Sequence, residues 1–215
     1  MNIVKRITDR IRTLPISHTL RLNISLALGL SLNLIYIVGN LASAFIYKSV
    51  WSATVVLYHL TLIVIRLYLL STRGSATRHG GIGSVCLRVG LLLLLLDLTS
   101  AFMMLYTVRR GSFVRYSGII LLGFVVYALY ACISSVAVIK RREGESEGLL
   151  AVAKSISLST ALMSIFNLQY SLLLLIGANM YLVARIVMLV GVAVFFVMLS
   201  LSVGLIRFGF GGSKK

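Results

Sequence analysis

The sequence predicts an all-α, polytopic membrane protein built as a bundle of six transmembrane helices. Hydrophobic residues make up 59% of the chain and charged residues only 12%, whereas a soluble domain typically carries about 25% charged residues. The mean hydropathy is +1.01. Because so few charged groups do not cover a surface that faces water, we expect lipid to cover most of this one.

Six mainly apolar stretches are long enough to cross the hydrocarbon layer, which takes about 20 residues in a helix. In lipid a helix satisfies its own backbone N–H and C=O groups, so stretches of this kind cross as helices. The fifth stretch is the most polar of the six. The predicted spans are 23–47, 51–70, 87–107, 116–139, 149–176 and 181–206.

The basic residues predict the orientation of the chain. With the N-terminus in the cytoplasm, most of the 21 Lys and Arg lie on the cytoplasmic side, and Arg66 lies inside a span. The positive-inside rule therefore predicts that both termini lie in the cytoplasm, with the basic residues against anionic headgroups. The basic residues left on the other side are Lys48, Arg109, Arg110, Arg115 and Arg185.

Three parts of the chain are expected: an N-terminal segment at 1–21, a transmembrane domain at 22–207 and a basic tail at 208–215. The first segment is too basic and its apolar span too long for a cleavable signal. Ile3, Ile7 and Ile11 recur at helical spacing and Pro15 ends the pattern. This is typical of an amphipathic helix on the inner leaflet, and the alternative is a frayed basic tail.

Two connections and a weak repeat complete the organisation. The Gly-rich connection 71–86 is expected to be flexible and 140–148, which mixes both charges, to be solvated; neither houses a catalytic domain. Arg21, Arg88 and Lys154 lie at or near the start of alternate spans, 67 and 66 residues apart. This spacing favours three similar helical hairpins, although any protein with six short-looped spans places basic residues at such intervals.

Asp97 is the only acidic residue inside a predicted span, near the middle of the third. A charge at that depth is costly, so it binds a proton, finds a partner or faces water. His59 lies at similar depth in the second span, and Arg66 follows one heptad later on the same face. If the two helices are antiparallel neighbours, these side chains form either a proton- or ion-handling cluster or a buried polar clamp with Arg66 snorkelling to the interface.

Two helices carry polar residues at steps of three and four. Such stripes usually mark a helix–helix interface in lipid, where small and hydroxyl residues allow close approach; the alternative is a polar cavity. The residues concerned are Asn33, Tyr36 and Asn40 in the first span, and Ser157, Thr160, Ser164 and Asn167 in the fifth.

Several function classes find no support in the sequence. The net charge is +16, but the Lys and Arg residues that produce it lie mainly at the ends of apolar stretches. They do not form a basic stripe along a soluble element that could bind a nucleic acid along its length. Cys86 and Cys132 form no disulfide or metal pattern. HExxH, GxSxG and Walker motifs are missing, and there is no second intramembrane carboxylate. We therefore predict no enzyme, no cofactor, no metal and no nucleic-acid partner.

Two segments carry a resemblance to a known family. They are Tyr47, Lys48, Ser49, Trp51, Tyr58, Arg66, Leu69 and Leu70, and Ala153, Lys154, Ala161, Leu162, Met163, Ser164, Leu168 and Gln169. Together they resemble an uncharacterised six-span membrane protein family of Gram-positive bacteria without an assigned activity, and cover about a quarter of the chain. The resemblance implies six helices in a bacterial plasma membrane. This chain has a shorter connection between its last two spans than the family.

The leading functional hypothesis is a permease-like or channel-like protein that moves a small solute or ion, as an oligomer because six short-looped helices enclose little volume. Asp97, His59 and Arg66 would form its polar centre. The alternative is a non-catalytic membrane subunit or scaffold that binds other membrane proteins through its striped helices.

Overall fold

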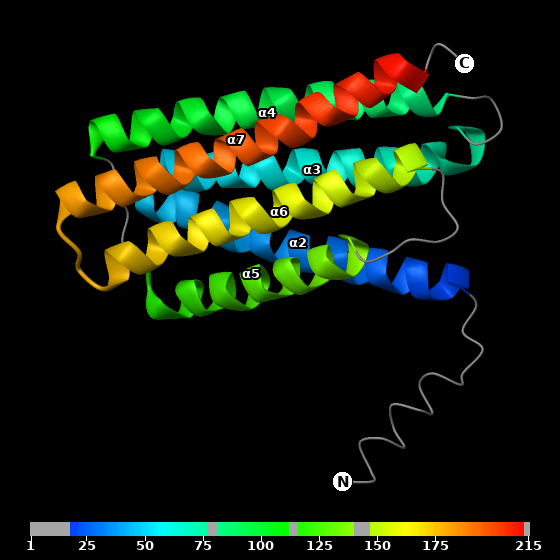
Figure 1. Ribbon diagram of the computed structural model, residues 1–215. Helices are drawn as coiled ribbons and strands as arrows, with labels where there is room; N and C mark the ends of the chain where they lie inside the picture. The colour runs from blue at the N-terminus through cyan, green and yellow to red at the C-terminus, as the bar shows by residue number, and fades with distance from the viewer. Residues whose placement is uncertain (1–17, 77–80, 112–115, 140–146, 213–215) are drawn as a thin grey trace, which may run out of the picture. The chain divides into compact units, whose positions relative to one another are not determined.

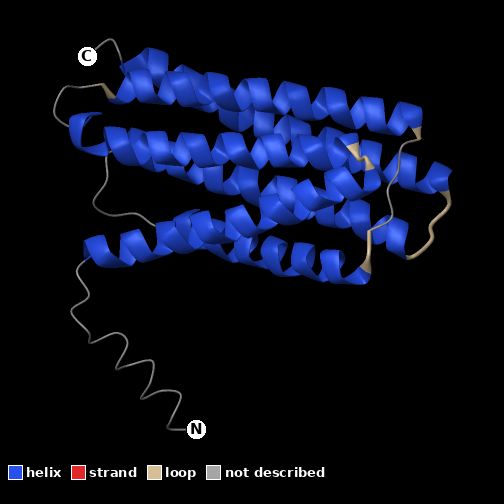
Figure 2. Cartoon of the chain, turned by 180° about the vertical axis from the view of Figure 1, so that it is seen from behind, coloured by secondary structure: helices blue, strands red, loops and turns tan. Residues whose placement is uncertain are grey.

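The computed structural model describes residues 18–76, 81–111, 116–139 and 147–212, which are nearly all helical (Figures 1 and 2). The chain divides into two compact units, Met1–Leu34 and Ile35–Lys215. The helices are α2 (His18–Tyr47), α3 (Val50–Ala76), α4 (Ile82–Arg110), α5 (Gly118–Ile139), α6 (Glu147–Leu175) and α7 (Met180–Gly212).

The predicted fold class is confirmed: the described chain is an all-α polytopic bundle without strands. Five helices, α3 to α7, are long and apolar enough to cross a membrane, and α2 contributes a shorter apolar stretch, Asn33–Tyr47. The helices mostly extend past the predicted spans. The predicted connection 71–86 is correspondingly shorter, since α3 continues to Ala76 and α4 begins at Ile82. The helices extend beyond their apolar residues because the hydrogen bonds of an α-helix join its own backbone groups and do not require lipid.

Local side-chain and turn chemistry sets several helix ends. The Ser52 amide donates to Ser49 Oγ (3.2 Å) before α3, and the Tyr181 amide donates to Asn179 Oδ1 (3.1 Å) before α7. Both are N-caps that satisfy amides left free at a helix start. Gly111 ends α4 in the left-handed region at φ 63°, a conformation that glycine adopts without cost. The two N-caps lie in the short turns between α2 and α3 and between α6 and α7.

Within the unit Ile35–Lys215, α4 packs most extensively against α7, and α5 packs against α6. Further contacts join α6 to α7 and α3 to α4, as the ribbon shows (Figure 1). At the α3–α4 contact, Arg88 donates to the Tyr68 hydroxyl (3.2 Å). In contrast, α4 and α5 follow each other in the chain but pack on different neighbours. The middle hairpin of the expected repeat is therefore not a packed pair.

Two glycines let α4 and α7 approach closely. A Cβ atom at Gly90 of α4 would lie 3.1 Å from both the Ile206 backbone N and the Ser202 carbonyl O of α7. A Cβ atom at Gly209 of α7 would lie 2.8 Å from the Gly83 carbonyl O. Small residues at such contacts are how membrane helices gain packing without a hydrophobic driving force. The α4–α7 contact is thus specified along much of its length.

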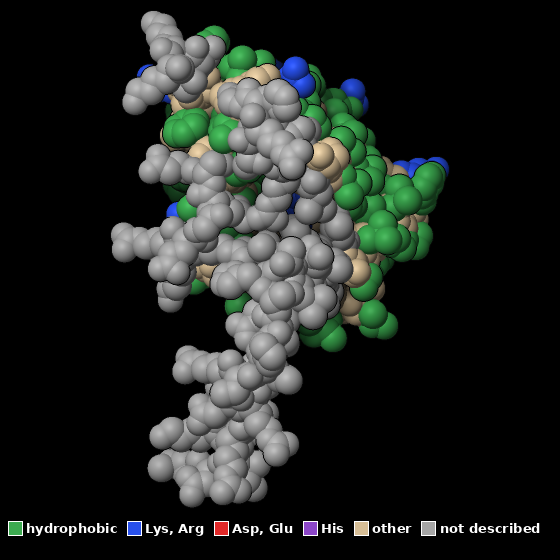
Figure 3. All heavy atoms as spheres, turned by 90° about the vertical axis from the view of Figure 1, so that its right-hand side faces the viewer, with side chains coloured by type: hydrophobic (Ala, Val, Ile, Leu, Met, Phe, Trp, Pro, Cys, Tyr) green, Lys and Arg blue, Asp and Glu red, His purple; other side chains and the backbone are tan. Residues whose placement is uncertain are grey.

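The outward side chains of the helices are large and apolar. Ile119 on α5 is 85% exposed, and Phe102 on α4 and Leu189 on α7 are also exposed. On the face in Figure 3, the visible described side chains are mostly hydrophobic, with few Lys and Arg. Water does not tolerate this much contiguous apolar surface, whereas acyl chains solvate it. Together with the five spans, this surface makes the chain an integral membrane protein.

Several expectations fall outside the described residues. They concern the amphipathic segment up to residue 17, residues 77–80 of the Gly-rich connection, 140–146 of the charged connection and 213–215 of the tail. The described start of the predicted tail is helical, because α7 continues to Gly212.

Candidate functional site

Asp97 is buried on α4 and bonds to α7. Its carboxylate is 2% exposed, and Ser202 Oγ donates to Asp97 Oδ2 at 2.7 Å. Among the described residues, the other oxygen, Oδ1, has no hydrogen-bond partner, and no hydrogen bond or ion pair joins Asp97 to His59 or Arg66. The expected cluster is therefore divided. The reason is the face of α4: Asp97 follows Gly90 by one heptad and so shares the side that packs on α7.

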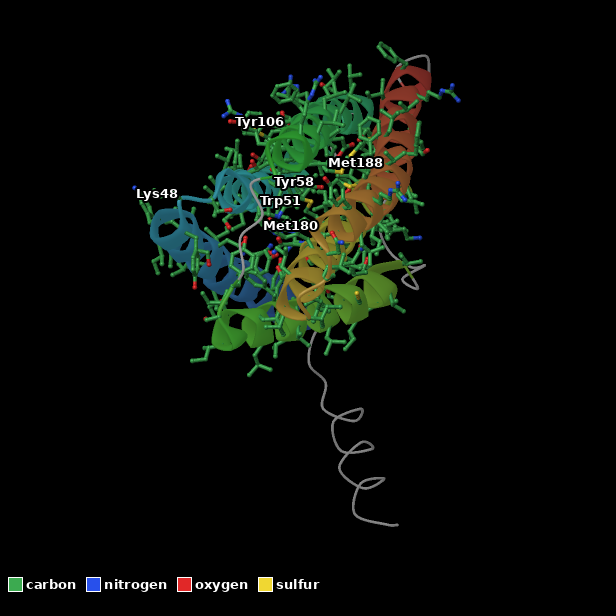
Figure 4. The ribbon with its side chains drawn as sticks, turned by 90° about the vertical axis from the view of Figure 1, so that its left-hand side faces the viewer. Lys48, Trp51, Tyr58, Tyr106, Met180 and Met188 are labelled. Carbon is green, nitrogen blue, oxygen red and sulfur yellow. The ribbon has the colours of Figure 1, made fainter. Side chains whose placement is uncertain are left out.

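A small cavity lies beside Asp97. Its volume is about 20 Å³, where one water molecule needs about 10–15 Å³. The wall comes from α3, α4, α6 and α7 and is nearly all apolar, so Asp97 is its one ionisable group. Figure 4 shows Trp51 and Tyr58 extending from α3 into the interior of the bundle. With Asp97, the wall includes Trp51, Met104, Met163, Phe166, Gly191 and Met198. We call this site the Asp97 cavity.

The cavity depends on residues that the sequence reasoning did not select. Ser202 fixes one carboxylate oxygen, and the Gly90 contact brings α7 close enough for it to do so. Gly191 makes room for Met104, since an added Cβ atom there would overlap the Met104 Sδ. A serine or a glycine in an apolar helix has no motif. The available signal was the heptad from Gly90 to Asp97, which places a small residue and the carboxylate on one face.

His59 is fully buried on α3 and packs among aromatic rings. Its Nδ1 lies 3.3 Å from the Tyr127 hydroxyl of α5, and its ring meets that of Tyr36 edge-on, with centroids 4.7 Å apart. Arg66 lies within electrostatic range of His59 and donates to Thr160 Oγ1 of α6 at 3.1 Å. These two predicted residues therefore belong to one buried region, which does not include Asp97.

The predicted polar stripes meet at Asn167. The Trp51 indole N–H donates to Asn167 Oδ1 (2.9 Å), and Asn167 Nδ2 donates to the Tyr36 hydroxyl (2.6 Å). Tyr36 in turn stacks on Tyr127, with ring centroids 4.0 Å apart. These contacts join α2, α3, α5 and α6 through neutral groups. We call Tyr36, Trp51, His59, Tyr127 and Asn167 the Asn167 seam.

The rest of the two stripes bonds mainly within its own helix. Thr160 donates to the Ile156 carbonyl (2.7 Å), Ser164 to the Thr160 carbonyl (2.6 Å), and the Asn40 amide to the Tyr36 carbonyl (2.9 Å). Hydroxyl groups in membrane helices commonly bond to the carbonyl one turn before them. Ser157 is half-buried and Asn33 belongs to the other unit. The α6 hydroxyls thus serve close packing and do not line the cavity.

Asp97 is the one ionisable residue on the cavity wall, so the chemistry that the cavity offers is that of one carboxylate. No group of three His, Cys, Asp or Glu side chains that holds a metal ion occurs among the described residues, and Cys86 and Cys132 are free thiols. Comparisons of the chain with protein families, with curated proteins and with solved structures find no match. Function must therefore be inferred from the Asp97 cavity itself.

Proposed function

We propose that this chain is a membrane permease for a small cation or proton, with Asp97 as its binding group. One observation carries the proposal. A carboxylate in the middle of a membrane helix lies on a cavity wall, and one of its oxygens has no protein hydrogen-bond donor. A buried carboxylate in lipid is costly unless it is protonated or paired with a cation. The Asp97 cavity supplies room for such a partner and only that one ionisable group.

The arrangement of the cavity supports reversible binding. The single hydroxyl proton of Ser202 is shared between Asp97 Oδ2 (2.7 Å) and the Met198 carbonyl (3.1 Å), so α7 holds the Oδ2 oxygen of Asp97 in place. Oδ1 remains available to a cation or proton. Because the cavity lies among α3, α4, α6 and α7, a movement of the closely packed α4–α7 pair relative to α3 and α6 would open it toward one side. Such rocking of helices around a central site is the usual basis of alternating access.

The membrane and the orientation are parts of the same proposal. We place the protein in a bacterial plasma membrane, as the family resemblance implies, with both termini in the cytoplasm. The distribution of Lys and Arg between the two sides supports this orientation. A homo-oligomer fits the small enclosed volume of a single bundle.

The test is flux into proteoliposomes, followed with a pH-sensitive dye and, in separate runs, with a membrane-potential dye and monovalent cations. Purified protein should raise flux above that of protein-free vesicles, and Asp97→Asn should lower it at least tenfold. Thr99→Val is the matched control, because Thr99 lies on the same helix but donates to its own Leu95 carbonyl (2.8 Å). Wild-type flux equal to that of empty vesicles for every cation would refute the permease.

A second function, a non-catalytic subunit of a membrane complex, is favoured by the Asn167 seam. There the polar side chains bond to each other and hold four helices together, which is what a scaffold requires. Purification in mild detergent distinguishes the two functions. One partner at constant stoichiometry, together with absent flux, favours the subunit; a lone or self-associated chain with Asp97-dependent flux favours the permease.

A further inference from the structure

Three methionines converge on the Asp97 cavity, one from each of three helices. Met104 comes from α4, Met163 from α6 and Met198 from α7, and all three are at most 5% exposed. The chain has seven methionines in total. Three thioethers, an indole ring and a carboxylate therefore surround a space that holds one or two water-sized objects. Thioether positions have no spacing signature, so the sequence did not indicate this grouping.

We propose that the Asp97 cavity is a binding site for a soft monovalent metal ion, Cu(I) or its analogue Ag(I). This inference deepens the proposed function and rests on it for the role in transport. Thioether sulfur is a soft ligand that selects Cu(I) over hard cations. Sodium, potassium and magnesium ions prefer several oxygen ligands, whereas the cavity offers few. The ligand set therefore favours a soft ion.

Charge and aromatic contacts favour a monovalent ion. The single carboxylate balances one positive charge, which makes the loaded site neutral and less costly in lipid. Trp51 lines the cavity while its indole N–H bonds to Asn167 and its ring packs against Phe166 and Tyr170, and an indole face attracts cations. A divalent ion would leave an uncompensated charge at the same depth.

The cavity volume separates a metal ion from an organic cation. At about 20 Å³ the space accommodates an ion of water size and not a quaternary ammonium group with its substituents. Met104 is held near Gly191, where a Cβ atom would overlap its sulfur. Asp97 Oδ1 supplies the buried polar atom without a partner that such a site requires. Packing alone would not need a carboxylate beside the thioethers.

Trp51 is the single tryptophan of the chain and so reports on the cavity directly. Ag(I) added to the detergent-solubilised protein should quench Trp51 fluorescence with a saturating, one-to-one titration. The variant Met104→Leu/Met163→Leu/Met198→Leu keeps the side-chain volumes and should weaken this binding at least tenfold. The matched control is Met103→Leu/Met180→Leu/Met188→Leu, which changes three methionines off the cavity wall and should titrate like the wild type.

Both triple variants, and the otherwise wild-type chain with which they are compared, carry Cys86→Ala and Cys132→Ala, because thiols also bind Ag(I). Labelled methionine methyl groups of the unmodified chain give a second measurement that does not depend on how any variant folds. Ag(I) should shift the resonances of Met104, Met163 and Met198 and leave those of Met103, Met180 and Met188 in place. Equal shifts at all six, equal quenching in both triple variants, or no response to Ag(I) would overturn the metal site.

The two proposals fail separately. If Ag(I) binds at the three cavity methionines but no metal ion crosses proteoliposomes, the metal site is supported and the permease function is refuted. If Asp97-dependent flux of another cation is measured and Ag(I) does not shift the resonances of the cavity methionines, the permease function is supported and the soft-metal site is refuted.

Discussion

The Asn167 seam and the Asp97 cavity both bury polar side chains among apolar helices, and they differ in how those side chains find hydrogen-bond partners. In the seam, the two polar ends of Asn167 meet the Trp51 N–H and the Tyr36 hydroxyl, all neutral groups. In the cavity, a carboxylate has one donor from Ser202 and one oxygen without a partner. Both polar ends of Asn167 have protein partners, although Nε2 of the seam's His59 has none among the described residues. The unpartnered oxygen of Asp97 differs in belonging to a carboxylate on the wall of a cavity.

This difference teaches how to separate structural from functional polar residues in a membrane bundle. Asn167 and Asp97 are both polar and both almost fully buried. What differs is charge, the number of protein partners and the presence of free space. Trp51 joins the two regions, because its N–H bonds to Asn167 while its ring lines the cavity. A change in one region should therefore be visible in the fluorescence of Trp51.

The largest loss of stability is expected at Gly90, where α4 packs closely against α7. In Gly90→Val the added carbons meet the Ile206 N and Ser202 O backbone atoms, so α4 and α7 must separate and Ser202 moves away from Asp97. We expect a loss of about 3 kcal/mol of stability, at the upper end for overpacked contacts, measured by thermal unfolding in detergent. Gly204→Val is the control on α7, since a Cβ atom there meets nothing within 4 Å. Equal losses in the two variants would contradict the close approach.

The second-largest loss of stability is expected at Asn167, in the Asn167 seam. Asn167→Ala leaves the Trp51 N–H and the Tyr36 hydroxyl buried without their partner. Interhelical hydrogen bonds in membranes are worth about 0.6–2 kcal/mol each, so we expect a loss of about 2 kcal/mol and a shift in the Trp51 emission maximum.

Ser171→Ala is the matched control for the seam. Its hydroxyl bonds only to the Asn167 carbonyl of its own helix (2.8 Å), and we expect a change below about 0.5 kcal/mol, as for substitutions that remove no contact between elements. If Asn167→Ala is as mild as Ser171→Ala, the seam does not hold the four helices together.

The helices themselves follow from the sequence, because an apolar stretch in lipid has no alternative to internal backbone bonding. The α2 and α6 stripes follow as well, since steps of three and four place Tyr36 and Asn167 on single faces. Periodicity also placed His59 and Arg66 together. It does not say which neighbouring helix each face meets: the sequence leads us to expect that Asp97 of α4 meets side chains of α3, whereas Ser202 of α7 donates to it.

The composition of the cavity wall is a second feature that the sequence does not predict. Met104, Met163 and Met198 lie on three helices far apart in the sequence, and their convergence depends on how the helices pack. The Gly90 and Gly209 contacts decide that packing, but a glycine in an apolar helix has several meanings. Sequence alone thus identified the costly residue, Asp97, and left its surroundings to the structure.

The smallest expected effect on stability is the most informative for the comparison. Asp97→Asn keeps the size of the side chain and an acceptor for Ser202, and it removes a charge from lipid depth. A charged carboxylate at the centre of a span costs about 2.5–3.5 kcal/mol on insertion scales, a cost that protonation, the Ser202 bond or a bound cation offsets. We therefore expect the unfolding free energy in detergent to stay unchanged or to rise by up to about 1 kcal/mol, while flux falls. A loss of stability as large as that of Asn167→Ala would show that Asp97 is a clamp like the seam.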